Sequence, residues 1–125
     1  MNGLKMLNKL NIKVRDTVFD PGLKENKVHA HGTGSKKPMY KVWLYLEGRD
    51  LPHVKSVTYQ LHPTFGDTLR VVERSYSNPN CSLIIWTWGI FTVHAYVEDK
   101  SGRKHEFVHS LQYGEQLRSG KWEYA

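Results

Sequence analysis

Hydrophobic and polar residues alternate along most of this chain, with the period of a β-strand. Side chains of a strand point to its two faces in turn, so a period of two predicts one buried and one outward face. The pattern is clearest over residues 40–47, where Val42 and Leu44 alternate with Lys41 and Trp43. Three further runs have the same period: residues 10–18, 54–62 and 91–98.

Four shorter segments complete the predicted strands. Residues 68–74 alternate, with Leu69 and Val71 facing opposite to Arg70. Residues 82–86 are almost entirely apolar, which is typical of a strand that is covered on both faces or lies at an edge contact. Residues 105–112 predict a last strand with Phe107 and Leu111 toward the core, and residues 27–31 predict a weak one. Turn-forming clusters separate the strands: Asp20-Pro21-Gly22, Ser77-Asn78-Pro79-Asn80 and Asp99-Lys100-Ser101-Gly102.

About seven to eight short strands with turns between them predict an all-β fold, an immunoglobulin-like antiparallel β-sandwich. No segment has a convincing amphipathic helical period. We expect an N-terminal strand and mobile polar loop that belong to the sandwich (residues 1–37), a core (38–113) and a C-terminal tail (114–125). The tail has no clear period, and the pattern leaves open whether Trp122 and Tyr124 dock on the sandwich or project from it.

Two loops carry the candidate binding chemistry. His62, Thr64 and Phe65 follow the strand 54–62, and Trp88-Gly89 joins two later strands. Each loop alone is also explained by turn structure, with Thr64 capping a turn, Phe65 plugging the sandwich end and Trp88-Gly89 forming a bulge. If both loops lie at one end, Phe65 and Trp88 face each other across a narrow slot with Thr64 and His62 at its floor. Thr64 Oγ1 would bond a ligand carbonyl while His62 fixes the hydroxyl, so the slot would hold a flat, mostly uncharged group.

Composition narrows the classes of function. The 125 residues suit one domain, and no apolar run approaches the roughly 20 residues that span a bilayer. Residues 1–10 lack a continuous apolar stretch and a cleavage site, so we predict no signal peptide. Cys81 is the only cysteine and can form no internal disulfide, which suits a reducing, cytoplasmic compartment. The net charge of +6 raises the case for nucleic acid or an acidic partner, although the charges are scattered.

Other candidate sites are weaker. His29 and His31 would ligate a metal from one strand face, but no Cys, Asp or Glu cluster completes the set. Asp67, beside the predicted slot, would favour a cationic methyl-lysine through ion pairing and cation–π contact. Cys81 has no neighbour in sequence that would activate it as a nucleophile. We therefore predict no catalytic residue, no metal, no cofactor and no membrane partner.

The strands and loops around these residues resemble the YEATS domain, most closely its prokaryotic branch. Three segments carry the resemblance, which covers roughly residues 38–113: YKVWLYLEG at 40–48, VKSVTYQLHPTF at 54–65 and TWGIFTV at 87–93. The resemblance implies an immunoglobulin-like sandwich that reads acylated lysine, especially acetyl- and crotonyl-lysine. It implies a pocket of His62, Thr64, Phe65 and Trp88, with the main-chain N–H groups of Trp88 and Gly89 near the acyl carbonyl.

The chain also departs from the eukaryotic members of that family. They usually place an aromatic residue in the loop ahead of the strand 40–47, whereas Gly32 to Lys37 contains none, and a net charge of +6 would repel a basic histone tail. We therefore expect an acylated lysine on a different protein or peptide, bound without catalysis. Two alternatives remain: a ligand-free protein–protein module of a bacterial signalling or defence assembly, and a nucleic-acid binder that uses the basic surface with outward Trp43, Tyr45 and Tyr96.

Overall fold

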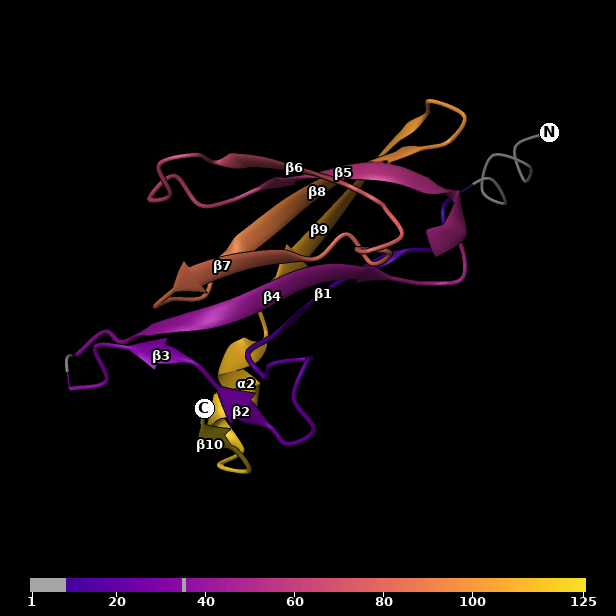
Figure 1. Ribbon diagram of the computed structural model, residues 1–125. Coiled ribbons are helices and arrows are strands. Elements are labelled where there is room, and N and C mark those ends of the chain that lie inside the picture. The colour runs from indigo at the N-terminus through magenta and orange to yellow at the C-terminus, as the bar shows by residue number, and fades with distance from the viewer. Residues whose placement is uncertain (1–8, 35) are drawn as a thin grey trace.

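Two antiparallel β-sheets pack face to face in the computed structural model, which describes residues 9–34 and 36–125 (Figure 1). In the first sheet, β4 (Met39–Glu47) pairs with β1 (Lys13–Thr17) and β3 (Ala30–His31) on one side and with β7 (Leu83–Thr87) on the other. The second sheet has the order β6 (Leu69–Glu73), β5 (Val54–Gln60), β8 (Thr92–Asp99) and β9 (Lys104–Ser110). The predicted sandwich is confirmed. The signal-peptide prediction falls mainly on residues 1–8, which lie outside the described residues.

Four shorter elements accompany the two sheets. The 3-10 turn η1 (Leu51–His53) joins β4 to β5, and the helix α2 (Tyr113–Arg118) follows β9. At the C-terminal end of the chain, β10 (Glu123–Tyr124) pairs in parallel with β2 (Lys27–Val28). Figure 1 shows α2, β2 and β10 grouped below the first sheet. In the described part of the chain, no helix is long and apolar enough to cross a membrane.

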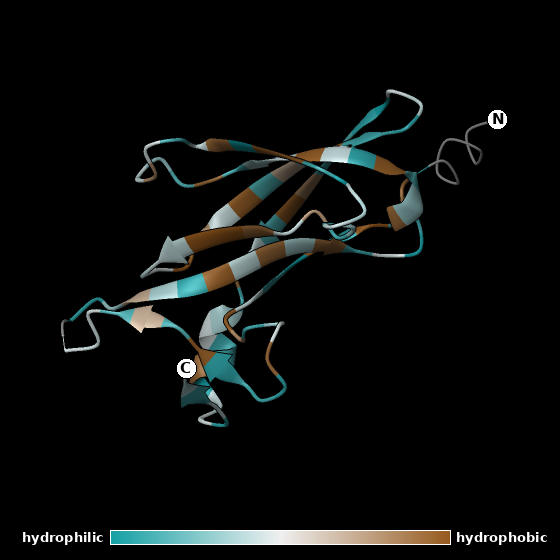
Figure 2. Ribbon diagram, viewed as in Figure 1, coloured by the Kyte–Doolittle hydropathy of each residue, from teal (hydrophilic) through white to brown (hydrophobic). Residues whose placement is uncertain are grey.

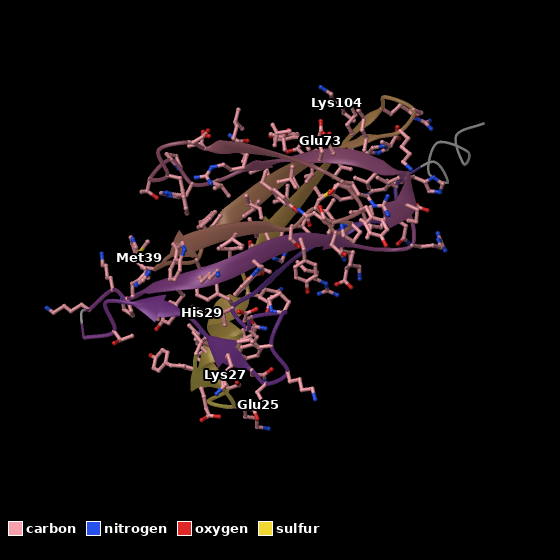
Figure 3. All side chains as sticks on the ribbon, viewed as in Figure 1. Glu25, Lys27, His29, Met39, Glu73 and Lys104 are labelled. Atoms are coloured by element: carbon pink, nitrogen blue, oxygen red, sulfur yellow. The ribbon has the colours of Figure 1, made fainter. Side chains whose placement is uncertain are left out.

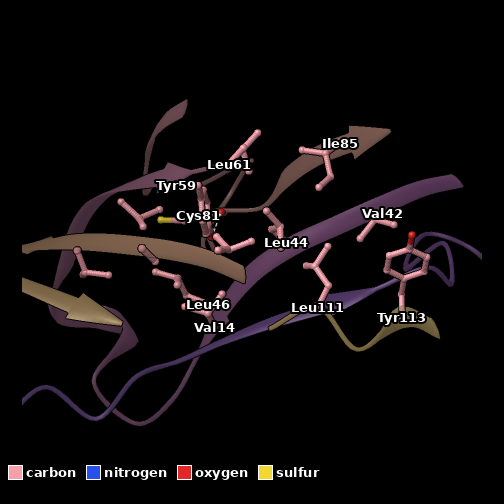
Figure 4. Packing of buried hydrophobic residues seen from close by; sticks show 14 of the residues in the cluster. Val14, Val42, Leu44, Leu46, Tyr59, Leu61, Cys81, Ile85, Leu111 and Tyr113 are labelled. Carbon is pink, nitrogen blue, oxygen red and sulfur yellow. Dashed lines mark hydrogen bonds between the residues drawn. The ribbon is translucent and has the colours of Figure 1, made fainter. Parts of the chain in front are cut away.

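The core lies between the inner faces of the two sheets. Val42 and Leu44 of β4 and Val57 and Tyr59 of β5 are fully buried. Figure 2 shows hydrophobic residues recurring at alternate positions along these strands, and Figure 4 shows part of the buried cluster. Burying one such aliphatic side chain contributes about 1.5–3 kcal/mol, so this cluster is the main source of stability. The Tyr59 hydroxyl inside it donates a hydrogen bond of 2.8 Å to the Cys81 carbonyl.

The structure adds detail to the predicted faces of three strands. Leu69 and Val71 face opposite to Arg70, as predicted, and are 53% and 68% exposed, because β6 is an edge strand whose other face turns toward the core. Of the two alternatives for the segment 82–86, the edge position fits: β7 lies at the edge of its sheet beside β4, and Ile84 is 46% exposed whereas Ile85 is buried. Trp43, expected to face outward, is only 7% exposed, because the chain between β1 and β2 folds over this side of the first sheet.

The C-terminal tail contains a helix that the sequence period did not predict. The helix α2 has six residues, which is too few to show an amphipathic period. It is held by the packing of Tyr113 and Leu117 on the core and by polar contacts. The Asp16 carboxylate accepts hydrogen bonds from the N–H groups of Gln112 and Tyr113, and the Gln116 side chain accepts one of 2.8 Å from the Val18 N–H.

The two aromatic residues of the tail have different environments. Trp122 docks against the fold, and its indole N–H donates a hydrogen bond of 2.9 Å to the Leu117 carbonyl. Tyr124 pairs with Val28 through the main chain, but its side chain is 52% exposed. Of the two tail residues whose position the sequence left open, Trp122 therefore docks on the fold, whereas the side chain of Tyr124 is about half exposed.

The hairpin between β8 and β9 is organised by one carboxylate. Asp99 Oδ1 accepts hydrogen bonds from the N–H groups of Ser101 and Arg103, at 2.9 and 3.1 Å, and Asp99 Oδ2 lies 2.9 Å from Nε2 of His105. Hydrogen bonds from Ser101 and His105 hold the pKa of Asp99 well below its usual value. Ionised Asp99 therefore stabilises the native hairpin.

Asp99→Asn is expected to lower the free energy of unfolding at pH 7, and its difference from the wild type should become smaller at acid pH. The native pKa of Asp99 lies below the unfolded value of about 4, so the stabilisation is present above that value and decreases as the pH falls below it. Urea unfolding of both proteins between pH 7 and pH 3 measures the difference. A difference that stays constant over this range would contradict the assignment.

Candidate functional site

Three loops lie together at one end of the sandwich. They are the β3–β4 loop (described over residues 32–34 and 36–38), the β5–β6 loop (61–68) and the β7–β8 loop (88–91). Figure 1 shows all three at the left of the molecule, because β5 and β7 end there and β4 begins there. Figure 3 marks the same end by Met39, the first residue of β4. The two loops singled out in the sequence are thus brought to one end.

The β5–β6 loop folds into a tight turn around His62. The Nδ1 atom of His62 accepts a hydrogen bond of 3.2 Å from the Thr64 N–H, so this nitrogen carries no proton. The Thr64 hydroxyl, 3.0 Å away, then donates to the same nitrogen. This differs from the expected bond from Thr64 to a ligand carbonyl, because the hydroxyl proton is already used. Thr64 Oγ1 is left as an acceptor.

A small hollow, here called the loop hollow, opens between the β5–β6 and β7–β8 loops. Its volume is about 150 Å³. Three predicted residues, Thr64, Phe65 and Trp88, line it, and Trp88 is 53% exposed. The predicted residues His62 and Gly89 do not line the hollow but bond residues that do: His62 bonds Thr64, and the Gly89 N–H lies 3.3 Å from Thr87 Oγ1. The complete lining is Met39, Thr64, Phe65, Trp86, Thr87 and Trp88.

The N–H group of Trp88 points away from β4. The Lys41 N–H donates a hydrogen bond to the His29 carbonyl, on the β3 side of β4. The N–H and C=O groups of the preceding residue, Tyr40, therefore point to the opposite side of β4, toward Thr87 of β7. Because these directions alternate along a strand, the N–H of Trp88, one residue after Thr87, points away from β4. The Gly89 N–H already has a partner in Thr87, so Trp88 offers the better donor of the two.

Residues that were not predicted as site residues also build this end. The Phe91 ring packs against Phe65, with ring centroids 5.5 Å apart, and against His62, at 6.0 Å. Its place in the alternating run 91–98 marked it only as a core residue. Lys37, in the loop that lacks an aromatic residue, places its Nζ 4.3 Å from the centroid of the Trp88 ring. Only the position of that loop next to the family motif could have indicated this contact.

The weaker candidates do not converge on a site. His29 bonds Asp20 at 2.8 Å, whereas the His31 ring stacks on Trp86 at 4.4 Å. Among residues 9–34 and 36–125, no group of three or more His, Cys, Asp or Glu side chains is placed to hold a metal ion. Asp67 is not part of the loop hollow and faces Arg70 at 4.0 Å. Burial raises the pKa of the Cys81 thiol to about 11, which suppresses the reactive thiolate.

The three aromatic residues proposed for nucleic-acid binding do not form one surface. Trp43 and Tyr45 lie on the outer side of β4, where they and Phe19 line a larger hollow of about 520 Å³. Tyr96 lies on β8 in the other sheet, and its hydroxyl donates to the Gln60 side chain. The larger hollow is distant from the β5–β6 and β7–β8 loops in the fold and contains none of the predicted site residues.

Comparisons with known proteins agree with this architecture. A family model described as the prokaryotic YEATS domain matches residues 40–112. The crystal structure of the yeast AF-9 homolog protein Yaf9 has a TM-score of 0.53 and 18% identity, and the match covers 81% of this chain and 68% of that chain. The Yaf9 YEATS domain bound to H3K27ac has a TM-score of 0.52 and 17% identity, over 83% of this chain and 75% of that chain. The Yaf9 YEATS domain recognising an H3K122suc peptide has a TM-score of 0.51 and 18% identity, with the same coverage.

No curated protein matches the sequence. At 17% and 18% identity, the likeness to Yaf9 shows a shared fold. The family model is the more specific finding, because it spans more than half of the 125 residues and includes both loops of the loop hollow. The chain therefore belongs to the prokaryotic YEATS domain family.

Proposed function

We propose that this protein is a recognition module that binds an acylated lysine in the loop hollow, without catalysis. The observation that carries the proposal is the joint lining of one small hollow by Phe65, Trp88 and the acceptor oxygen of Thr64. Its volume of about 150 Å³ is well below the roughly 300 Å³ at which pockets for whole small molecules begin, so it suits the tip of a side chain. The Yaf9 structures with H3K27ac and H3K122suc support the same class of ligand.

The polar groups of the hollow complement an amide. The acyl amide of the ligand is planar and neutral, so it can stack on Phe65 and Trp88 and gain about 0.5–1.5 kcal/mol per aromatic contact beyond burial. In this proposal Thr64 Oγ1 accepts the amide N–H, and the Trp88 N–H donates to the acyl carbonyl. Each such hydrogen bond contributes about 0.5–1.5 kcal/mol net. Both polar ends of the ligand amide would thereby have a partner.

The charge around the hollow favours an acylated lysine over a free one. An unmodified or methylated lysine would bring a second cation close to Lys37 Nζ, which already lies over the Trp88 ring. Two like charges about 4 Å apart repel by roughly 1 kcal/mol in bulk water and by roughly 4 kcal/mol near a protein surface. The net charge of +6 acts in the same direction on the rest of a partner, so we propose an uncharged or acidic protein segment rather than a histone tail.

The test is calorimetric titration with acetyl-, crotonyl-, trimethyl- and unmodified lysine in one acidic peptide. We expect binding of the two acyl peptides only. Phe65→Ala and Trp88→Ala should each weaken acyl-peptide binding by about tenfold or more. Each substitution removes a stacking contact and the burial of that ring, and these two contributions add up to at least about 1.4 kcal/mol per variant. Tyr76→Ala is the matched control, because Tyr76 is fully exposed and outside the hollow. If no acyl peptide binds, or if both ring variants bind as the wild type does, the proposal is wrong and a protein–protein module becomes the better reading.

A further inference from the structure

The peptide groups around Gly89 are held by hydroxyls from two parts of the chain. Thr87 Oγ1 accepts from the Gly89 N–H and donates to the Gly89 carbonyl, each at 3.3 Å. The Tyr113 hydroxyl donates to the same carbonyl at a shorter distance, 2.8 Å. Among the described residues, and apart from its two chain neighbours, nothing lies within 4 Å of where a Gly89 side chain would begin. Glycine has the widest backbone freedom of all residues, so these hydrogen bonds largely determine how this loop is held.

Tyr113 is itself rigidly placed. It is only 2% exposed, its N–H donates to Asp16 Oδ2 at 2.9 Å, and its ring contacts Tyr40 with centroids 6.2 Å apart. Figure 4 shows the Tyr113 ring rising from α2 at the Val42 end of the buried cluster. Burial raises the pKa of Tyr113 to about 12, so its hydroxyl stays protonated and remains a donor at ordinary pH. The bond to Gly89 therefore starts from a fixed donor.

The segment around Tyr113 touches the β7–β8 loop at two further points. The Leu111 N–H donates a hydrogen bond of 3.1 Å to the Phe91 carbonyl. A methyl group on Gly114 would lie 3.6 Å from Ile90 Cδ1, which shows that the main chain at Gly114 packs on Ile90. Residues 111–114 thus contact residues 89, 90 and 91. This part of the β7–β8 loop leads from Trp88, which lines the loop hollow, to Phe91, whose ring packs against Phe65.

We propose that Tyr113 is a positioning residue of the loop hollow, acting through Gly89 on the orientation of Trp88. By fixing the Gly89 carbonyl, its hydroxyl keeps the Trp88 ring and N–H in the arrangement that receives the acyl amide. The inference rests on the proposed function of the hollow. It also extends the site beyond the family match, because Tyr113 follows the last matched residue, 112. The C-terminal segment is thereby a functional part of the reader.

The test compares Tyr113→Phe with Tyr40→Phe. Both variants keep the ring and lose one hydroxyl, but the Tyr40 hydroxyl bonds to none of the residues that the structure describes, so Tyr40→Phe reports on the ring pair alone. Two readouts are needed: the affinity for the acetyl-lysine peptide, and the order of the backbone amides of Trp88, Gly89 and Ile90 from NMR relaxation of the free protein. The melting temperature of each variant is recorded as a third value, because a purely structural residue would change that value only.

Tyr113→Phe is expected to weaken acetyl-lysine binding by about three- to tenfold, the effect of one lost hydrogen bond, and to increase motion at residues 88–90. Tyr40→Phe should change neither. Unchanged order of residues 88–90 in Tyr113→Phe overturns the inference, and so does unchanged affinity while the wild type binds. If the wild type binds no acyl peptide, the proposed function fails separately, and Tyr113 is judged by the amide order alone.

Discussion

Replacing Asp16 with alanine is expected to lower the free energy of unfolding by about 3–5 kcal/mol, the cost of removing one partner from a buried polar pair. The Asp16 side chain is completely buried. Its carboxylate lies 2.6 Å from His109 Nε2 and accepts hydrogen bonds of 2.9 Å from the N–H groups of Gln112 and Tyr113. The alanine variant would leave these three donors without their acceptor, the N–H of the buried Tyr113 among them, at a joint between β1, β9 and α2.

Urea unfolding followed by circular dichroism measures this loss. The matched control is Glu47→Ala, which removes a carboxylate from the same sheet. Glu47 pairs with Arg15 at the surface and is 45% exposed, so its loss should cost less than about 1 kcal/mol. An Asp16→Ala protein that is as stable as the Glu47→Ala protein would show that the buried carboxylate is not the anchor of the C-terminal segment.

Gly48→Ala is expected to cost roughly 3 kcal/mol or more, because backbone strain and a steric clash act together. Gly48 has a φ of +144°, a region that residues with side chains rarely adopt. A Cβ atom there would lie 2.3 Å from the Asn11 carbonyl oxygen and 2.9 Å from Ile12 Cα. Both contacts are with main chain, so the start of β1 would have to move away from the end of β4.

Gly102→Ala provides the control for the strain alone. Gly102 also has a positive φ, +90°, but in the described part of the chain, apart from its two neighbours in sequence, no atom lies within 4 Å of the position of its Cβ. Its substitution should therefore cost only the conformational part, about 1–3 kcal/mol. Thermal and urea unfolding of the two variants separate the contributions. Equal losses would mean that the β1–β4 contact adjusts without cost.

Much of the sandwich could be predicted because one period governs it. The alternation over β4, β5 and β8 reflects a core that these strands share, so Val42, Val57 and Val97 were placed correctly from local sequence. The faces of β6 and the cover over Trp43 could not be derived in the same way. They depend on which strands lie at the sheet edges and on where the chain between β1 and β2 folds, and both are set by contacts between distant segments.

The candidate site, like the fold, could be predicted from local sequence only in part. The loops with Phe65 and Trp88 were found because each carries a short motif, and the fold brings them to one hollow. The direction of the Thr64 hydroxyl depends on which hydrogen bond His62 Nδ1 already accepts, which no spacing records. The contribution of Tyr113 is a bond across 24 residues to a glycine carbonyl, a group that has no side-chain signature in the sequence.

The pairing of β1 with β4 extends the folded unit beyond the residues that the family model matches. The family model matches residues 40–112, yet all five residues of β1 pair with β4 from outside that range. A protein trimmed to the matched residues would leave one side of its longest strand unpaired along Trp43 to Glu47, an open edge that invites association with other copies. By covering this edge, β1 therefore protects the matched residues from strand pairing with other copies.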